Sequence, residues 1–189
     1  MRDFNYIFGI GPGKSGTHSL WHALSAFDLS VLHIGNNTHN SGNVAEQING
    51  NRNNNRPVLT GVPVRDAYLD YPINDIDPTI LDAQYPESLF ILTYRNPDAL
   101  ALSWARMCIG IESARHHEIT YSQYAENARR LYNRALTFAK KLPDRFLIID
   151  TQIAGPTNML KLAKFLDCPP SDKDWPHSFN HQDWYQNDV

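Results

Sequence analysis

Five short apolar runs divide the chain into alternating segments. They cover residues 4–10, 30–34, 57–62, 89–94 and 145–149. Most of these runs are continuous rather than alternating with polar residues, which is typical of strands covered on both faces of a sheet. We therefore predict five strands in a buried and mostly parallel sheet.

Segments with the spacing of amphipathic helices lie between these runs. Leu20, Leu24 and Phe27 fall on one apolar face of residues 19–27. Asn96 and Pro97 are residue types that cap and begin a helix. The predicted helices cover residues 19–27, 97–109, 121–142 and 159–166. Strands that alternate with helices predict an α/β fold, a three-layer sandwich around the sheet.

One segment departs from this alternation. Residues 36–56 are rich in asparagine and contain few apolar side chains. We predict a long loop there, inserted into a single domain that spans residues 1–189. The loop is interpreted either as a solvated insertion or as a lid over a bound substrate.

Composition narrows the class of protein further. The net charge of −3 argues against a general nucleic-acid binder, and no apolar run approaches the length of a membrane-spanning helix. The first strand-like run starts at Phe4 and leaves no room for a signal peptide, so we expect a cytoplasmic protein. Cys108 and Cys168 match no metal-ligand spacing and are interpreted as small apolar side chains.

A glycine-rich segment follows the first predicted strand and leads into the first predicted helix. It reads Gly-Ile-Gly-Pro-Gly-Lys-Ser-Gly-Thr-His-Ser-Leu over residues 9–20. Glycines allow the backbone to wrap around an anion, and a helix N-terminus presents unpaired amides to it. Lys14 adds a cation, and Ser15, Thr17 and Ser19 add hydroxyl groups. We predict a phosphate-binding loop.

This loop matches the phosphate loop of nucleoside triphosphatases only in part, because Phe8 stands where that motif requires its first glycine. It is more similar to the 5′-phosphosulfate loop of sulfotransferases, usually written P-K-[ST]-G-T. Residues 14–17 fit that motif without change, and one extra residue, Gly13, separates Pro12 from Lys14.

A second segment is similar to the 3′-phosphate motif of the same family. Arg95 ends the fourth predicted strand, Asn96 and Pro97 follow, and Ser103 stands eight residues after the arginine. A guanidinium group and a hydroxyl group arranged in this way grip one phosphate. Arg106 lies one helical turn beyond Ser103 and is a further candidate.

Weaker similarities to the same family extend over most of the chain, at residues 82–93, 142–145, 160–169 and 175–180. The chain lacks the Arg-Lys-Gly motif of the cytosolic small-molecule branch. It therefore resembles the short, divergent, bacterial-type sulfotransferases, whose fold is similar to that of the P-loop nucleoside triphosphatases.

The resemblance implies a reaction and its components. The donor is 3′-phosphoadenosine 5′-phosphosulfate (PAPS), the product is 3′-phosphoadenosine 5′-phosphate (PAP), and the acceptor is a hydroxyl or amine of a small molecule or glycan. Lys14 neutralises charge on the leaving nucleotide, and no metal is needed. The donor-binding residues implied are Gly13, Lys14, Ser15, Gly16, Thr17, His18, Ser19, Arg95 and Ser103.

The acceptor also requires a general base. Compact relatives have Asp-x-Pro after a central strand, whereas this chain has Gly61 before Val62 and Pro63. Asp66, three residues beyond that proline, is the first candidate for the base. His33, at the end of the second predicted strand, is the second candidate, and Asp70 is the third.

Two other functions stay open at the level of sequence. A small-molecule kinase would explain residues 13–15 but not the spacing of Arg95 and Ser103, and it would need an acidic residue at a strand end to hold Mg²⁺. A non-catalytic nucleotide-binding relative would explain the altered position Gly61.

Overall fold

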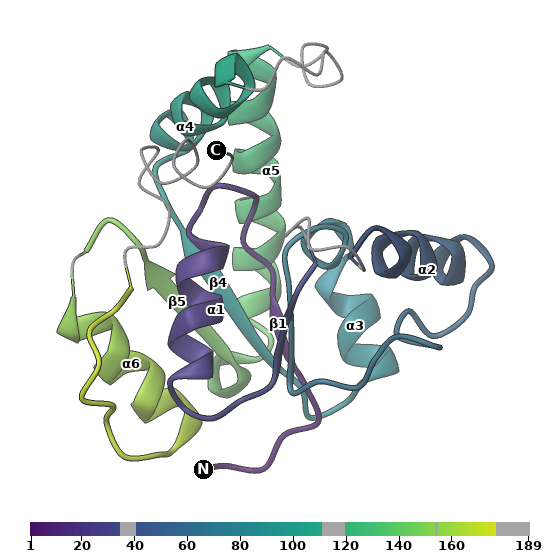
Figure 1. The fold of residues 1–189 in the computed structure, drawn as a ribbon. Coiled ribbons are helices and arrows are strands. Elements are labelled where there is room, and N and C mark those ends of the chain that lie inside the picture. The colour runs from purple at the N-terminus through teal and green to yellow at the C-terminus, as the bar shows by residue number, and fades with distance from the viewer. Residues whose placement is uncertain (35–40, 111–119, 154, 177–189) are drawn as a thin grey trace, which may run out of the picture.

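A parallel sheet of five strands forms the centre of the molecule, as Figure 1 shows. The computed structural model describes residues 1–34, 41–110, 120–153 and 155–176. The strands lie in the order β2-β3-β1-β4-β5, and all of the pairings are parallel. Their bounds are β1 Ile7–Gly9, β2 Val31–His33, β3 Ala67–Leu69, β4 Leu89–Tyr94 and β5 Phe146–Asp150. The predicted α/β fold with its five-stranded sheet is confirmed.

Helices cover both faces of this sheet (Figure 1). On one face, Ile7, Leu69 and Ile91 pack against α1 (Thr17–Ser25) and α6 (Pro156–Leu166). On the other face, Phe8 and Phe90 pack against α5 (Tyr121–Ala139) and α3 (Pro78–Gln84). Successive strand residues point to opposite faces, so continuous apolar runs are what two covered faces require.

Four predicted helices are present with small shifts of their ends. They are α1, α4 (Pro97–Gly110), α5 and α6. The predicted cap of α4 is confirmed, because Asn96 Oδ1 accepts hydrogen bonds from the amides of Asp98 at 2.9 Å and Ala99 at 3.3 Å. Over the described residues, the structure contains no helix with the length and apolarity to cross a membrane.

The prediction of a strand at residues 57–62 is wrong. Val58, Leu59 and Val62 are buried as expected, but the segment forms turns. Side chains replace a strand partner, since the amide of Leu59 donates to the hydroxyl oxygen of Tyr85 and Asn51 Nδ2 donates to the carbonyl of Val58. The central strand of this region is β3, which starts five residues after the predicted strand ends.

The prediction of a loop over residues 36–56 is also wrong for most of its length. Residues Ser41–Asn53 form α2, while residues 36–40 lie outside the described part of the chain. Ile48 is fully buried, and Val44 and Ala45 pack beside it against the core. Three apolar residues at helical spacing anchor the helix, and the surrounding asparagines concealed them in the sequence.

Candidate functional site

The carboxyl ends of the five parallel strands meet at one edge of the sheet, which is where ligands of such sheets bind. The segment after β1 is the predicted phosphate loop. The backbone takes a left-handed conformation at Lys14, with φ of 64°, and at Gly16, with φ of 104°. Helix α1 begins directly afterwards at Thr17. A helix N-terminus presents the amides of its first turn toward the preceding loop, which is the geometry that binds anions in proteins.

The carbonyl oxygens of this loop are held by side chains from four other elements. Asn74 Nδ2 donates to Gly11 O at 3.0 Å, and the Tyr124 hydroxyl donates to Gly13 O at 3.2 Å. Arg95 Nη1 donates to Lys14 O at 3.3 Å, and Thr151 Oγ1 donates to Ser15 O at 2.8 Å. The N–H of a peptide unit points opposite to its C=O. The amides of Lys14 and Gly16 therefore point away from these side chains, toward the side where an anion would bind.

The hydroxyl groups of the loop have different positions. Ser15 is fully buried, and its Oγ lies 2.6 Å from Thr93 Oγ1 on β4. The Thr17 hydroxyl lies 3.1 Å from His33 Nε2. The Ser15 side chain thus connects the loop to β4, whereas the Thr17 side chain connects it to the end of β2.

Gly16 is a position in the loop where both the neighbouring atoms and the backbone conformation disfavour a side chain. A Cβ atom there would lie 2.7 Å from Thr151 Cγ2, in addition to the strain of its positive φ. We expect Gly16→Ala to lower the free energy of unfolding by about 2 kcal/mol. Adding Thr151→Ser, which removes Cγ2, should restore part of that loss in urea denaturation. An unchanged midpoint for Gly16→Ala would contradict the packing described here.

Arg95 and Ser103 lie on the β4 side of the loop. Arg95 follows β4, its backbone amide donates to the Tyr132 hydroxyl at 3.0 Å, and its guanidinium group reaches the loop as described above. Ser103 is half-buried on the second turn of α4. Arg106, one turn further, is exposed. The structure thus places Arg95 next to the loop and Ser103 on the helix that follows it.

Asp66 lies at the opposite edge of the sheet, so it is wrongly placed for the predicted role. It directly precedes β3 and therefore stands at the amino end of that strand. Its carboxylate accepts hydrogen bonds from the amide of Ser30 at 2.7 Å and from the hydroxyl of Ser30 at 2.6 Å. The error follows from the strand predicted at 57–62, because the true strand begins after Asp66 rather than before it.

The other two candidate bases, His33 and Asp70, meet at the edge of the sheet where the strands end. His33 ends β2 and Asp70 follows β3, which are neighbouring strands. Nε2 of His33 lies 3.7 Å from Asp70 Oδ2, and only 6% of the His33 side chain is exposed. His33 Nδ1 is buried without a hydrogen-bond partner among the described residues. Nε2 is the ring nitrogen that faces Thr17 and Asp70.

Burial shifts the pKa values of the titratable side chains at this edge of the sheet. Removal from water lowers the pKa of His33 to about 4. It also lowers the pKa of His18 to about 4, with further contributions from His33, His22 and Lys14. The pKa of Asp70 is raised by burial, and a hydrogen bond from the backbone of Tyr71 and the charge of Lys14 act against that increase. Both histidines are consequently neutral at pH 7.

The burial of Asp70 predicts that its ionised carboxylate lowers the stability of the folded protein. Its folded-state pKa lies above the ordinary value of 3.8, so the folded protein binds more protons and loses stability as pH rises from about 4 through the folded-state pKa. Asp70→Asn should therefore raise the free energy of unfolding above that of the unmodified protein at pH 7. At pH 3.5 the difference between the two proteins should be smaller. Asparagine also tolerates the φ of 71° at this position. Urea denaturation at both pH values checks this, and a loss of stability at pH 7 would contradict it.

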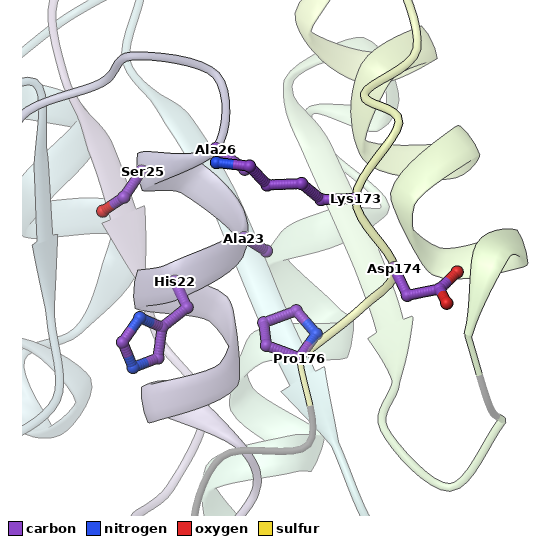
Figure 2. Close-up of a pocket in the computed structure, with 7 residues that line it drawn as sticks. All are labelled: His22, Ala23, Ser25, Ala26, Lys173, Asp174 and Pro176. Atoms are coloured by element: carbon purple, nitrogen blue, oxygen red, sulfur yellow. The ribbon is translucent and has the colours of Figure 1, made fainter.

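A separate pocket of about 450 Å³ lies between α1 and residues 173–176 (Figure 2). Its lining includes His22, Ala26, Lys173, Asp174 and Pro176, and Figure 2 shows the Lys173 side chain extending toward Ala26. The predicted site residues are absent from this lining. The strand-end site is therefore distinct from this pocket.

Among the described residues, no group of three histidine, cysteine, aspartate or glutamate side chains is arranged to hold a metal ion. Sequence reasoning missed Asn74, Tyr124 and Thr151, which all hold loop carbonyls. They come from three separate segments, and only the fold brings them together. No local motif marks them.

Comparisons with known proteins identify the family and the fold of this chain. The family described as "Sulfotransferase domain" matches residues 6–152. Among solved structures, the "Sulfotransferase Domain from the Curacin Biosynthetic Pathway" is 18% identical, with a TM-score of 0.55 over 89% of this chain and 76% of that chain. The "Sulfotransferase Domain from the Synechococcus PCC 7002 Olefin Synthase" is 16% identical, with a TM-score of 0.55 over 89% and 75%.

A sulfotransferase from Alicyclobacillus acidocaldarius is 14% identical, with a TM-score of 0.50 over 95% of this chain and 87% of that chain. No curated protein matches the chain by sequence. At these identities the structural likeness establishes the fold, and the family match extends from β1 to the residues just after β5.

Proposed function

Because this chain belongs to the sulfotransferase-domain family, we propose that it transfers a sulfuryl group from PAPS to a hydroxyl or amine acceptor. One observation carries the proposal most directly. Side chains from four elements hold the carbonyls of the loop between β1 and α1, which leaves backbone amides and Lys14 on the side that would meet a phosphosulfate.

The donor site is proposed to have two parts. The amides of residues 14 and 16–19 bind the 5′-phosphate at the N-terminus of α1. Arg95 and Ser103 bind the 3′-phosphate on the β4 side of the loop, since a guanidinium group and a hydroxyl together match a phosphate. Arg95 already donates to the loop backbone, so it connects the two parts.

The proposed reaction is an in-line displacement at sulfur. The acceptor oxygen or nitrogen forms a bond to sulfur while the bond from sulfur to the bridging oxygen breaks, and PAP leaves with that oxygen. Charge develops on the bridging oxygen, and Lys14 is the cation of the loop that neutralises it. The acceptor loses one proton, which requires a base on the side opposite the leaving nucleotide.

Asp70 is proposed as that base, with His33 as the group that orients it. The burial of Asp70 raises its pKa, which strengthens the carboxylate as a proton acceptor. His33 Nε2 faces this carboxylate and Thr17. The imidazole therefore holds Asp70 on the side of the loop from which the acceptor would approach. This assignment replaces Asp66, whose carboxylate is bound to Ser30 at the other edge.

The geometry disfavours the kinase alternative. In P-loop kinases, the serine or threonine after the loop lysine holds Mg²⁺ together with an acidic strand-end residue. The corresponding Ser15 is fully buried and its hydroxyl is paired with Thr93, an uncharged residue. A metal-free transfer is therefore the better match to this loop.

The proposal is tested by a donor comparison. The protein is incubated with a panel of hydroxyl and amine acceptors, with PAPS in the presence of a chelator or with ATP and Mg²⁺, and modified acceptors are identified by mass spectrometry. We expect sulfated products from PAPS without metal. Phosphorylated products from ATP would support the kinase, and PAPS binding without any product from the panel would favour a non-catalytic relative.

A further inference from the structure

Asn74 occupies an unusual position between the two sides of the site. It lies in the short 3₁₀ turn Ile73–Asp75 that follows β3, and only 6% of it is exposed. Its Nδ2 lies 3.0 Å from Gly11 O in the phosphate loop and 3.4 Å from Asp70 Oδ1. One amide group thus contacts both the donor loop and the carboxylate on the acceptor side.

The position of Asn74 is itself fixed from outside the site. Arg134 of α5 donates through Nη2 to Asn74 O at 2.9 Å and through Nη1 to Asp75 O at 3.4 Å. The amide of Asn74 donates to Asp70 O at 3.4 Å. The turn is therefore held by α5 and by the residue that follows β3, so the side-chain amide approaches the loop from a fixed support.

We propose that Asn74 is a positioning residue that sets the separation between the phosphate loop and Asp70. The inference rests on the proposed function, because it assigns Asn74 to a donor site and a base that are themselves proposals. Without the side-chain amide of Asn74, Gly11 O loses its hydrogen-bond donor and the loop relaxes. The nucleotide then has to restore the shape of the loop when it binds, which lowers its affinity. Asp70 also loses a donor that favours its ionised form.

The first test compares two buried asparagines. Asn51 is 2% exposed and donates to two backbone carbonyls, Val58 O at 3.0 Å and Thr60 O at 2.8 Å, outside the proposed site. We expect Asn74→Ala to weaken the binding of PAP about tenfold, measured by calorimetry. Asn51→Ala should lower stability to a similar extent and leave the affinity unchanged.

The second test uses Asn74→Asp, which keeps the shape of the side chain. At pH 8 the introduced carboxylate cannot donate to Gly11 O and repels Asp70, so PAP should bind more weakly than to Asn74→Ala. Toward pH 5.5 the carboxyl gains a proton and donates again, so the affinity relative to the unmodified protein should recover. Among the charged or titratable groups here, Asp70 and Arg134 contact Asn74 directly. His33 and Lys14 lie near Asp70, and Arg52 pairs with the neighbouring Asp75.

The outcomes separate the two proposals. If the unmodified protein does not bind PAP, the proposed function fails and takes this inference with it. If the unmodified protein binds PAP and both Asn74 variants bind it equally well at all pH values, the inference alone is overturned. Arg134→Gln, which alters the contact from α5 to the Asn74 turn, is the variant to use if the Asn74 variants do not fold, and it should weaken PAP binding in the same direction.

Discussion

Replacing Lys14 with methionine should lower the rate of sulfuryl transfer by about 100- to 1,000-fold, which is the usual effect of removing one group that stabilises transition-state charge. Methionine keeps the length of the side chain and adopts the backbone conformation at φ 64° about as readily as lysine does. The affinity for PAP should change less, because the amides of the loop and Arg95 still hold both phosphates.

The control for this change is Lys161→Met, which removes an exposed lysine from α6. It alters the net charge equally and should leave the rate as it is. Product formation is followed with the acceptor identified in the panel. A rate within a factor of ten of the unmodified protein for Lys14→Met would contradict the role of Lys14 at the bridging oxygen.

Arg95→Ala should remove the preference of the protein for a 3′-phosphate. A charge-assisted, two-pronged contact to phosphate is worth about 1.5–3 kcal/mol, so the affinity for PAP should fall roughly 10- to 150-fold. AMP lacks the 3′-phosphate, and its affinity should fall only slightly, through the loss of the contact from Arg95 to Lys14 O. Calorimetric titrations with the two nucleotides measure this difference.

Arg130→Ala is the matched control for Arg95→Ala. Arg130 is exposed on α5, and its guanidinium group contacts Asn127 on the same helix. The variant carries the same net charge as Arg95→Ala, so it separates local contact from general electrostatics. Equal losses for PAP and AMP in Arg95→Ala would show that the arginine supports the loop and does not read the 3′-phosphate.

The sequence was most informative where a local pattern determines local structure. The glycine-rich loop, Asn96 as a helix cap and the continuous apolar run of β4 all depend on neighbours in the chain, and each was predicted correctly. The fold class followed from the alternation of strands and helices. The two phosphate motifs could be placed at strand ends for the same reason.

The errors arose where contacts between distant segments decide the outcome. Residues 57–62 have the composition of a strand, yet Asn51 and Tyr85 bind their backbone and leave the sheet position to β3. As a result, Asp66 lies at the amino end of β3, whereas Asp70 lies at its carboxyl end beside His33.

The Asn-rich segment concealed α2 because its apolar residues are few and lie at helical spacing. Asn74 and Thr151 bind the loop from positions 63 and 136 residues away from their partners, which no local pattern reveals.

The most direct test of the account is a calorimetric titration of the unmodified protein with PAP in the presence of a chelator, beside titrations with AMP and with ATP plus Mg²⁺. The account predicts that PAP binds without metal and at least tenfold more tightly than AMP, because Arg95 and Ser103 recognise the 3′-phosphate. Tighter binding of ATP with Mg²⁺, or equal binding of PAP and AMP, would contradict it.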